Sequence, residues 1–170
     1  MTENNEVPKG KQTSLGLYIT AKEAYEKWKS DPAGVKILDV RTPEEYLFVG
    51  HPEMALNIPL VFVTHQWDAK KNGPVFAPNA EFIAAAKRAY DTEDTILVTC
   101  RSGGRAALAI NTLAKAGFSN VYNITDGMEG DMVKDPGSAF CGQHMINGWK
   151  NSGAPWTYAV DRDLVWIDAS

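Results

Sequence analysis

The sequence has few of the residues that build disulfide or metal frameworks. Two cysteines and three histidines are present among 170 residues, which excludes a disulfide-rich scaffold. Cys141 and His144 have the Cys-x-x-His spacing of a metal-ligand pair, but a structural site needs about four ligands and no second close pair accompanies them. We therefore expect no metal and no other cofactor. The cysteine count leaves the redox compartment undecided.

Long apolar runs and an excess of positive charge are also missing. No stretch approaches the roughly 20 apolar residues that cross a bilayer, so we expect no membrane partner. The formal net charge is −4, which argues against nucleic acid as the main partner. A chain of 170 residues is one ordinary domain, long enough to bury about 70% of its extended surface.

The first residues are polar and show no apolar periodicity. We expect residues 1–15 to form a flexible segment and residues 16–170 to form a single domain. The opening residues also lack the apolar core of a signal peptide. As written, the chain is therefore expected in the cytoplasm, and in the periplasm if Met1 replaces a signal peptide that has been removed.

Short apolar runs alternate with amphipathic segments along the chain. Strands are predicted at about 35–39, 55–57, 95–99 and 121–124. Helices are predicted after capping signals at Thr20 and Thr42, and over about 79–90 and 104–115. This alternation predicts the α/β class, with a parallel sheet covered by helices on both faces. In such sheets ligands bind beyond the carboxyl ends of the strands.

Cys100 lies where one of these strands meets a glycine-rich loop. The strand at 95–99 is followed by Cys100, then by Arg101-Ser102-Gly103-Gly104-Arg105 and an apolar helical run. Backbone N–H groups at the start of a helix and two arginines stabilise negative charge, so the pattern predicts a nucleophilic thiolate at Cys100 and a local attraction for small anions. Core packing alone has no need of two glycines and two arginines in five positions.

The length of the loop narrows the chemistry. Its Cys-x4-Arg spacing is one residue shorter than the Cys-x5-Arg loop of cysteine enzymes that handle phosphate, and one residue of chain spans up to about 3.5 Å. The tighter ring suits a group smaller than phosphate, such as a single sulfur atom carried on the cysteine. A phosphatase or an arsenate reductase would need the longer loop. A catalytically inactive binding module would be expected to have lost Cys100.

Several segments, in order, resemble the rhodanese family of sulfurtransferases. They are the loop 100–105, the strand and acidic helix at 35–46, the Gly-His stretch 50–60, the strand region 116–124, and the Trp-x-x-x-Gly-x-Pro ending within 148–156. Together they cover most of residues 18–156. The resemblance implies a five-stranded parallel sheet in three α/β/α layers. It also implies a thiosulfate sulfurtransferase that has no cofactor.

The resemblance implies that Cys100 takes a sulfane sulfur from thiosulfate or a related small anionic donor. It holds the sulfur as a persulfide and passes it to cyanide, to a thiol, or to a protein acceptor. The backbone N–H groups of residues 101–105, with Ser102, Gly103 and Gly104 in the middle, would hold the anionic sulfur. A sulfur-carrier or regulatory binding module stays open as the alternative.

The two loop arginines each keep two interpretations. Arg101 either pairs with the sulfonate of the donor or is a solvated surface arginine. Arg105 either binds substrate or binds neighbouring carbonyl groups and fixes the shape of the loop. Outside the loop, Asp39 and Arg41 are expected to form a supporting ion pair. His51 is expected to stabilise a turn rather than to act as a base.

Two segments are longer than the resemblance predicts, at about 61–78 and 131–147. Both follow strands whose carboxyl ends share an edge with Cys100, so we expect them to wall the substrate pocket. The second segment contains Cys141, for which a packed, inert thiol is the default. The alternative is that Cys141 accepts sulfur from Cys100 or closes a disulfide with it.

Overall fold

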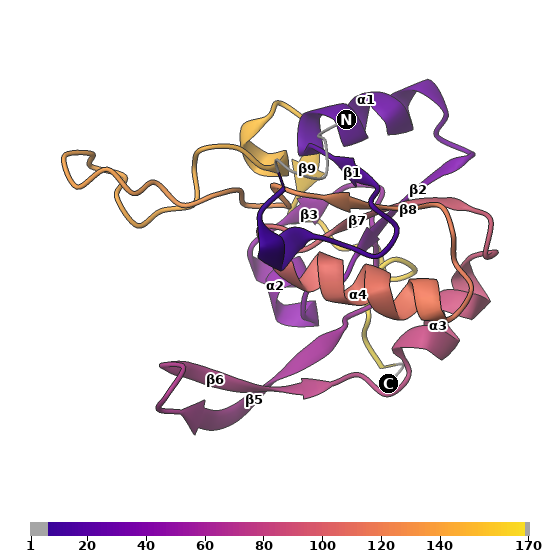
Figure 1. Cartoon of the computed structure of the whole chain (residues 1–170), viewed down its shortest axis with the longest axis horizontal. Helices are drawn as coiled ribbons and strands as arrows, with labels where there is room; N and C mark the ends of the chain where they lie inside the picture. Colours follow the sequence, from indigo (N-terminus) through magenta and orange to yellow (C-terminus); the bar gives the residue numbers. More distant parts are fainter. Residues whose placement is uncertain (1–6, 169–170) are drawn as a thin grey trace.

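A five-stranded parallel sheet forms the centre of the computed structural model, which describes residues 7–168 (Figure 1). The strands follow the order β1 (Tyr18–Ile19), β8 (Val121–Ile124), β7 (Thr95–Thr99), β2 (Val35–Asp39) and β4 (Leu56–Asn57), and all neighbours are parallel. This confirms the predicted fold class. The sequence pattern did not locate β1, because two residues are too short to show a period.

Helices cover both faces of this sheet. They are α1 (Ala21–Ser30), α2 (Pro43–Phe48), α3 (Phe82–Ala89) and α4 (Gly104–Lys115), and α1 and α4 lie on opposite sides of the sheet (Figure 1). Capping boxes start α1 at Thr20 and α2 at Thr42, as predicted. Helix α3 begins three residues later than predicted, because Asn79 instead donates to the Pro59 carbonyl and accepts the Glu81 N–H.

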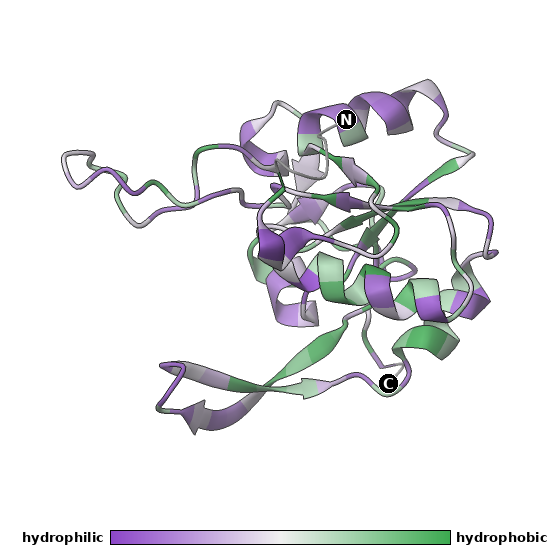
Figure 2. Cartoon of the chain, in the orientation of Figure 1, coloured by the Kyte–Doolittle hydropathy of each residue, from purple (hydrophilic) through white to green (hydrophobic). Residues whose placement is uncertain are grey.

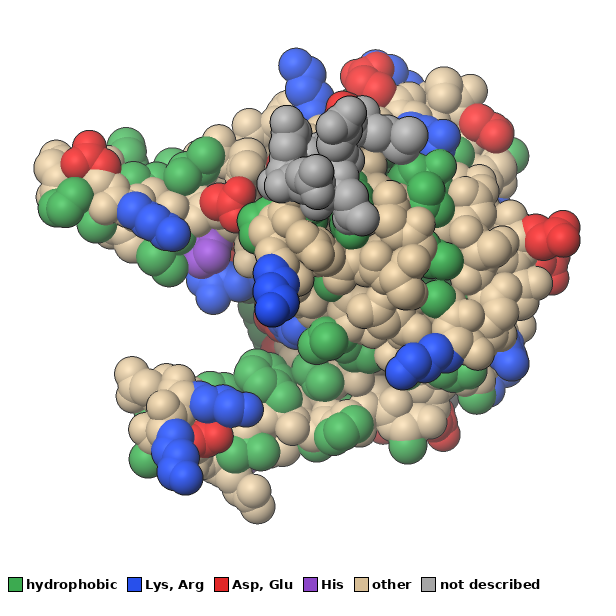
Figure 3. All heavy atoms as spheres, in the orientation of Figure 1, with side chains coloured by type: hydrophobic (Ala, Val, Ile, Leu, Met, Phe, Trp, Pro, Cys, Tyr) green, Lys and Arg blue, Asp and Glu red, His purple; other side chains and the backbone are tan. Residues whose placement is uncertain are grey.

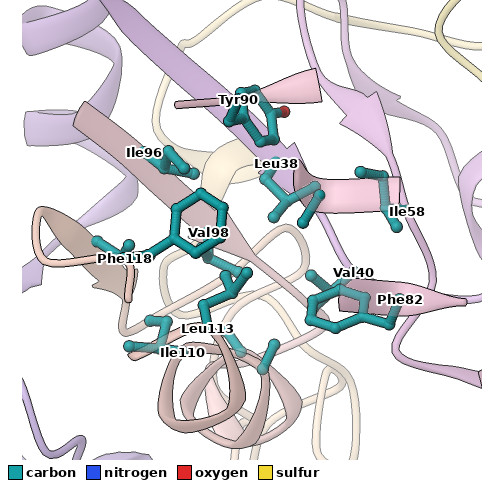
Figure 4. Close-up of a cluster of buried hydrophobic side chains, with 14 of the residues drawn as sticks. Leu38, Val40, Ile58, Phe82, Tyr90, Ile96, Val98, Ile110, Leu113 and Phe118 are labelled. Atoms are coloured by element: carbon teal, nitrogen blue, oxygen red, sulfur yellow. The ribbon is translucent and has the colours of Figure 1, made fainter. Parts of the chain in front are cut away.

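Side chains of the central strand β7 alternate between two apolar cores. Ile96, Val98 and Cys100 belong to the core that α3 and α4 cover, part of which is drawn in Figure 4. Leu97 belongs to the core on the side of α1. Because a slip of one residue would move each of these side chains to the wrong face, packing on both faces fixes the position of Cys100.

The two insertions project from one side of the domain (Figure 1). Residues 61–78 form an antiparallel hairpin of β5 (Val61–Asp68) and β6 (Gly73–Pro78), which pair only with each other. Residues 131–147 extend as an irregular arm with a single bridge between Met132 and His144. Asp68 pairs with Gly73, so residues 69–72 form the connecting loop, in which Asn72 has a φ of 52°.

Four short elements complete the fold. Strands β3 (His51–Pro52) and β9 (Trp156–Thr157) pair antiparallel, and two 3-10 turns, η1 (Lys9–Lys11) and η2 (Trp149–Asn151), flank the sheet. Among the described residues, no helix is long and apolar enough to cross a membrane.

The prediction of a flexible segment over residues 1–15 is wrong for residues 7–15. Val7 is buried, and Leu15 packs against the core that α4 covers. The Lys11 ammonium donates to the Thr125 carbonyl at 2.7 Å and lies 2.9 Å from a carboxylate oxygen of Asp131. These partners are more than 100 residues away, so the local polar composition gave no sign of them. Residues 1–6 lie outside the described residues.

Two leucines test whether the sheet core carries the stability of the fold. Leu97 is fully buried, whereas Leu108 on α4 is 62% exposed. We expect Leu97→Ala to lower the free energy of unfolding by about 2–5 kcal/mol, and Leu108→Ala to change it by less than about 0.5 kcal/mol. Equilibrium urea denaturation of both variants measures the difference. Equal losses would contradict the placement of β7 between two cores.

Candidate active site

Cys100 lies between the end of β7 and the start of α4, as the sequence predicts. Its side chain is only 1% exposed, and its Sγ accepts a hydrogen bond of 3.1 Å from the Gly103 N–H. Among the described backbone groups of residues 101–105, this N–H is the one that bonds the sulfur. The sulfur therefore lies at the positive end of α4, where negative charge is stabilised.

The shape of the loop depends on a left-handed residue at Gly103. Gly103 is the N-cap of α4 and has a φ of 102°, a conformation that a residue with a side chain rarely adopts. A Cβ at this position would lie 2.5 Å from the Thr125 carbonyl oxygen. The Gly103 carbonyl in turn accepts an N–H of the Asn123 amide at 3.1 Å. Glycine is thus required here for both the turn and the close approach of β8.

A second segment supports the loop from the other side. The Met128 N–H donates to the Cys100 carbonyl at 2.8 Å, and the Glu129 N–H donates to the Arg101 carbonyl at 3.0 Å. Gly127 permits this contact, since a Cβ there would lie 2.7 Å from the Cys100 carbonyl oxygen. The first two loop residues are therefore held by the backbone that follows β8.

Arg105 binds a carboxylate, and not the loop carbonyls that were one of its two predicted roles. Its two terminal nitrogens donate to the two oxygens of Glu45 at 2.6 and 2.8 Å. Burial raises the pKa of the Glu45 carboxyl, but the hydrogen bonds and charge of Arg105 outweigh burial, so the pKa is lower than its ordinary value. This paired contact ties α2 to α4. The sequence pattern predicts Glu45 only as part of the capping box of α2 and does not predict its contact with Arg105.

Arg101 is held more loosely. Its side chain is 51% exposed, and its Nε lies 3.4 Å from a carboxylate oxygen of Glu129. A pair of this length and exposure is weak, so an anionic ligand can compete with Glu129 for the guanidinium. The structure therefore keeps open both interpretations of Arg101. Glu129 was not recognised from the sequence, because it lies in the turn after β8 and has no local motif.

The predicted ion pair of Asp39 and Arg41 is present beneath the loop. Both side chains are fully buried, and Arg41 contacts the two Asp39 oxygens at 3.0 and 2.7 Å. Arg41 also donates to the Gly50 carbonyl at 2.8 Å. Asp39 lies beside Thr99 in the sheet register. The pair therefore ties the end of β2, beside the end of β7, to the turn before β3, and it has a structural role.

His51 is a buried structural residue in this fold. Its Nδ1 lies 2.8 Å from the Tyr46 carbonyl oxygen, and its ring stacks on the Tyr46 ring with centroids 3.7 Å apart. Both contacts hold the turn between α2 and β3, which is the role predicted from the sequence. They leave the imidazole enclosed, with 2% of the residue exposed.

A cavity of about 420 Å³ opens beside the loop. Arg101 and Arg105 line one side, and Val63 and Phe76 of the hairpin line another. Figure 3 shows the hollow between the hairpin and the arm 131–147. The first insertion therefore contributes to the wall of a cavity beside the loop, although Cys100 itself is not among the lining residues. That this cavity is the substrate pocket stays a prediction. The arm does not line this cavity and instead lines a separate one of about 580 Å³ beside Lys11.

Cys141 differs from the expectation of a packed thiol. It is exposed on the projecting arm, and both Cys100 and Cys141 are free thiols. The arm has few apolar neighbours to enclose it, because it lies outside the body of the domain (Figure 1). The predicted metal-ligand partner His144 contacts the Gly130 carbonyl oxygen through Nδ1. Within residues 7–168, no group of three or more His, Cys, Asp and Glu side chains is arranged to hold a metal ion.

Comparisons with known proteins agree on one family. A family model described as a rhodanese-like domain matches residues 20–132. An uncharacterised protein of Rickettsia prowazekii is 34% identical over 122 residues, which are 72% of this chain and 82% of that protein. The chloroplastic thiosulfate sulfurtransferase 16 of Arabidopsis thaliana is 35% identical over 95 residues, which are 56% of this chain and 72% of that protein. A crystal structure of an M. tuberculosis protein matches with a TM-score of 0.64 at 25% identity, over 83% of this chain and 96% of that chain.

The pair of Glu45 and Arg105 predicts a pH-dependent contribution to stability. The Glu45 pKa in the folded state lies below its ordinary value of 4.5, so the unfolded chain takes up this proton at a higher pH than the folded chain. The contribution is thus complete above pH 4.5 and is lost as the pH falls through the lower folded value. We expect Glu45→Gln to lower the free energy of unfolding by about 1–3 kcal/mol at pH 7, and by less below pH 4. Denaturation curves at several pH values test this, and a difference that does not depend on pH would contradict it.

Proposed function

The chain belongs to the rhodanese-like domain family, and on that premise we propose that it transfers sulfur through a persulfide on Cys100. The observation that carries the proposal is the hydrogen bond from the Gly103 N–H to the Cys100 sulfur at the N-terminus of α4. A donor in this position stabilises the Cys100 thiolate before it attacks the donor and again when it is released from the persulfide. The likeness to a thiosulfate sulfurtransferase supports thiosulfate as the donor.

The reaction has two displacement steps. In the first, the Cys100 thiolate attacks the outer sulfur of thiosulfate, the sulfur–sulfur bond of the donor breaks, and sulfite leaves with the bonding electrons. In the second, cyanide or a thiolate attacks the outer sulfur of the Cys100 persulfide, and the Cys100 thiolate leaves. A general base is not needed for attack when the thiol is already ionised, which agrees with the enclosed position of His51.

Arg101 is the residue that we assign to the donor. It lines the pocket, its guanidinium is half-exposed, and its contact with Glu129 is long. A sulfonate can therefore replace the Glu129 carboxylate and form paired, charge-assisted hydrogen bonds with it. Arg105 is assigned a positioning role, because both of its terminal nitrogens are already used by Glu45.

The persulfide is tested by the mass of the intact protein. After incubation with thiosulfate we expect the mass of one added sulfur atom, its loss after treatment with cyanide, and double-displacement kinetics. Cys100→Ser should abolish all three. Cys141→Ser is the matched control and should behave like the wild type, because Cys141 is exposed on the projecting arm. Turnover by Cys100→Ser, or hydrolysis of aryl phosphates by the wild type, would overturn the proposal.

Arg101→Ala tests the assignment of the donor site. We expect the variant to lose about 1.5–3 kcal/mol of transition-state binding with thiosulfate, the scale of a hydrogen bond to a charged group. An uncharged polysulfide donor should lose much less. Arg88→Ala is a control, because Arg88 is an exposed arginine on α3. Values of kcat/KM for both donors measure the effect, and equal losses would instead assign Arg101 to the architecture of the loop.

A further inference from the structure

The pocket beside the loop carries more negative than positive charge. Arg105 is paired with Glu45, and Arg101 is paired with Glu129. Each arginine that would attract an anion is thus matched by a carboxylate in the same pocket. Glu44 also lines this pocket, is exposed, and has no ion pair among the described residues. The lining as a whole therefore has a net negative charge, whereas the two arginines alone predict an attraction for small anions.

Part of the pocket wall is apolar. Val49 follows α2, and Val63 and Phe76 lie on β5 and β6, where Figure 2 shows apolar stretches on the hairpin. Phe76 is 46% exposed. Thiosulfate and cyanide have no hydrocarbon portion to place against these side chains. The cavity of about 420 Å³ also falls in the range of pockets that bind larger organic molecules, about 300–1,000 Å³.

We propose that this pocket receives the sulfur acceptor, and that the acceptor is an aminothiol, a small organic thiol with a positively charged amine. The proposal rests on the sulfur transfer proposed above. The ammonium group pairs with Glu44, and the carbon body contacts Val63 and Phe76. The thiol then approaches the persulfide past Arg101 and Arg105, the two residues of the Cys100 loop that line the pocket. Cys100 is itself buried and lies outside the lining, so the outer sulfur of the persulfide is the atom that must reach the pocket. A thiol of similar length that carries a carboxylate in place of the amine is repelled by Glu44.

The transfer step balances without any further reagent. The thiolate of the acceptor attacks the outer sulfur of the Cys100 persulfide, and a new sulfur–sulfur bond forms on the acceptor. The bond between Sγ and the outer sulfur breaks, and its electron pair remains on Sγ. The products are the persulfide of the aminothiol and the Cys100 thiolate, with no net oxidation or reduction. The Gly103 N–H then stabilises the released thiolate.

Three thiols of similar size and different charge test this assignment. The protein is first loaded with thiosulfate and freed of excess donor. Its discharge is then followed with cysteamine, 2-mercaptoethanol and 3-mercaptopropionate, and each rate is expressed per thiolate. We expect Glu44→Gln to lower the ratio of the cysteamine rate to the 3-mercaptopropionate rate about fivefold, because an exposed ion pair is lost and a repulsion is removed. Comparing one ratio between two proteins cancels the intrinsic reactivity of the thiols.

Two further variants separate charge from packing. Glu93→Gln removes an exposed carboxylate in the turn before β7, at the opposite edge of the sheet from Cys100, and should leave the ratio unchanged. Phe76→Ala should raise the concentration of each organic thiol needed for half-maximal discharge about threefold or more, since apolar contact with the hydrocarbon portion of the thiol is removed. Discharge by cyanide should be unchanged, because cyanide has no hydrocarbon portion to contact Phe76.

The outcomes distinguish this proposal from the one on which it rests. If thiosulfate adds no sulfur to Cys100, the sulfur transfer itself is wrong. If sulfur is added and cyanide removes it, but Glu44→Gln leaves the ratio unchanged, the aminothiol assignment is wrong and the sulfur transfer stands. Equal effects of Phe76→Ala on cyanide and on the thiols would overturn the role of the hairpin as the wall for the acceptor.

Discussion

The left-handed turn at Gly103 is the constraint on which the rest of the site depends. It reverses the chain between β7 and α4 within a few residues, and it directs one backbone N–H to the Cys100 sulfur. The same residue packs against the Thr125 carbonyl so closely that a Cβ would overlap it. The nucleophile, the helix terminus and the neighbouring strand are therefore fixed by a single residue. Since β7 packs on both faces, the sheet in turn fixes where this loop begins.

Three arginine–carboxylate pairs near the loop differ in the exposure of their arginine side chain. The arginine side chain is 0% exposed in the pair with Asp39, 23% in the pair with Glu45 and 51% in the pair with Glu129. The contacts are 2.7, 2.6 and 3.4 Å in the same order. A buried pair is costly to break, whereas an exposed pair contributes little. The inner two pairs thus support the loop, and the outer one can exchange its partner for a ligand.

Local signals predicted the parts of the fold that depend on neighbouring residues. Capping residues at Thr20 and Thr42 and the glycines around α4 placed three helices to within about one residue. Partners distant in sequence were not predicted. Lys11 contacts Thr125, and Arg105 contacts Glu45, but neither pair has a spacing that a helix or a strand would reveal. The hairpin was not predicted either, because its strands pair only with each other across a four-residue loop, 69–72, that carries no two-residue turn signal.

In the proposed reaction, sulfur is held covalently on Cys100 between two separate steps. Sulfite release in the absence of any acceptor is the direct test of this persulfide. When the protein is mixed with thiosulfate alone, we expect a rapid release of one sulfite per chain, and none after Cys100 has been alkylated. Sulfite that appears only when an acceptor is also present would show direct transfer between the two substrates. That result would contradict the persulfide, whatever the fold and the family of the chain.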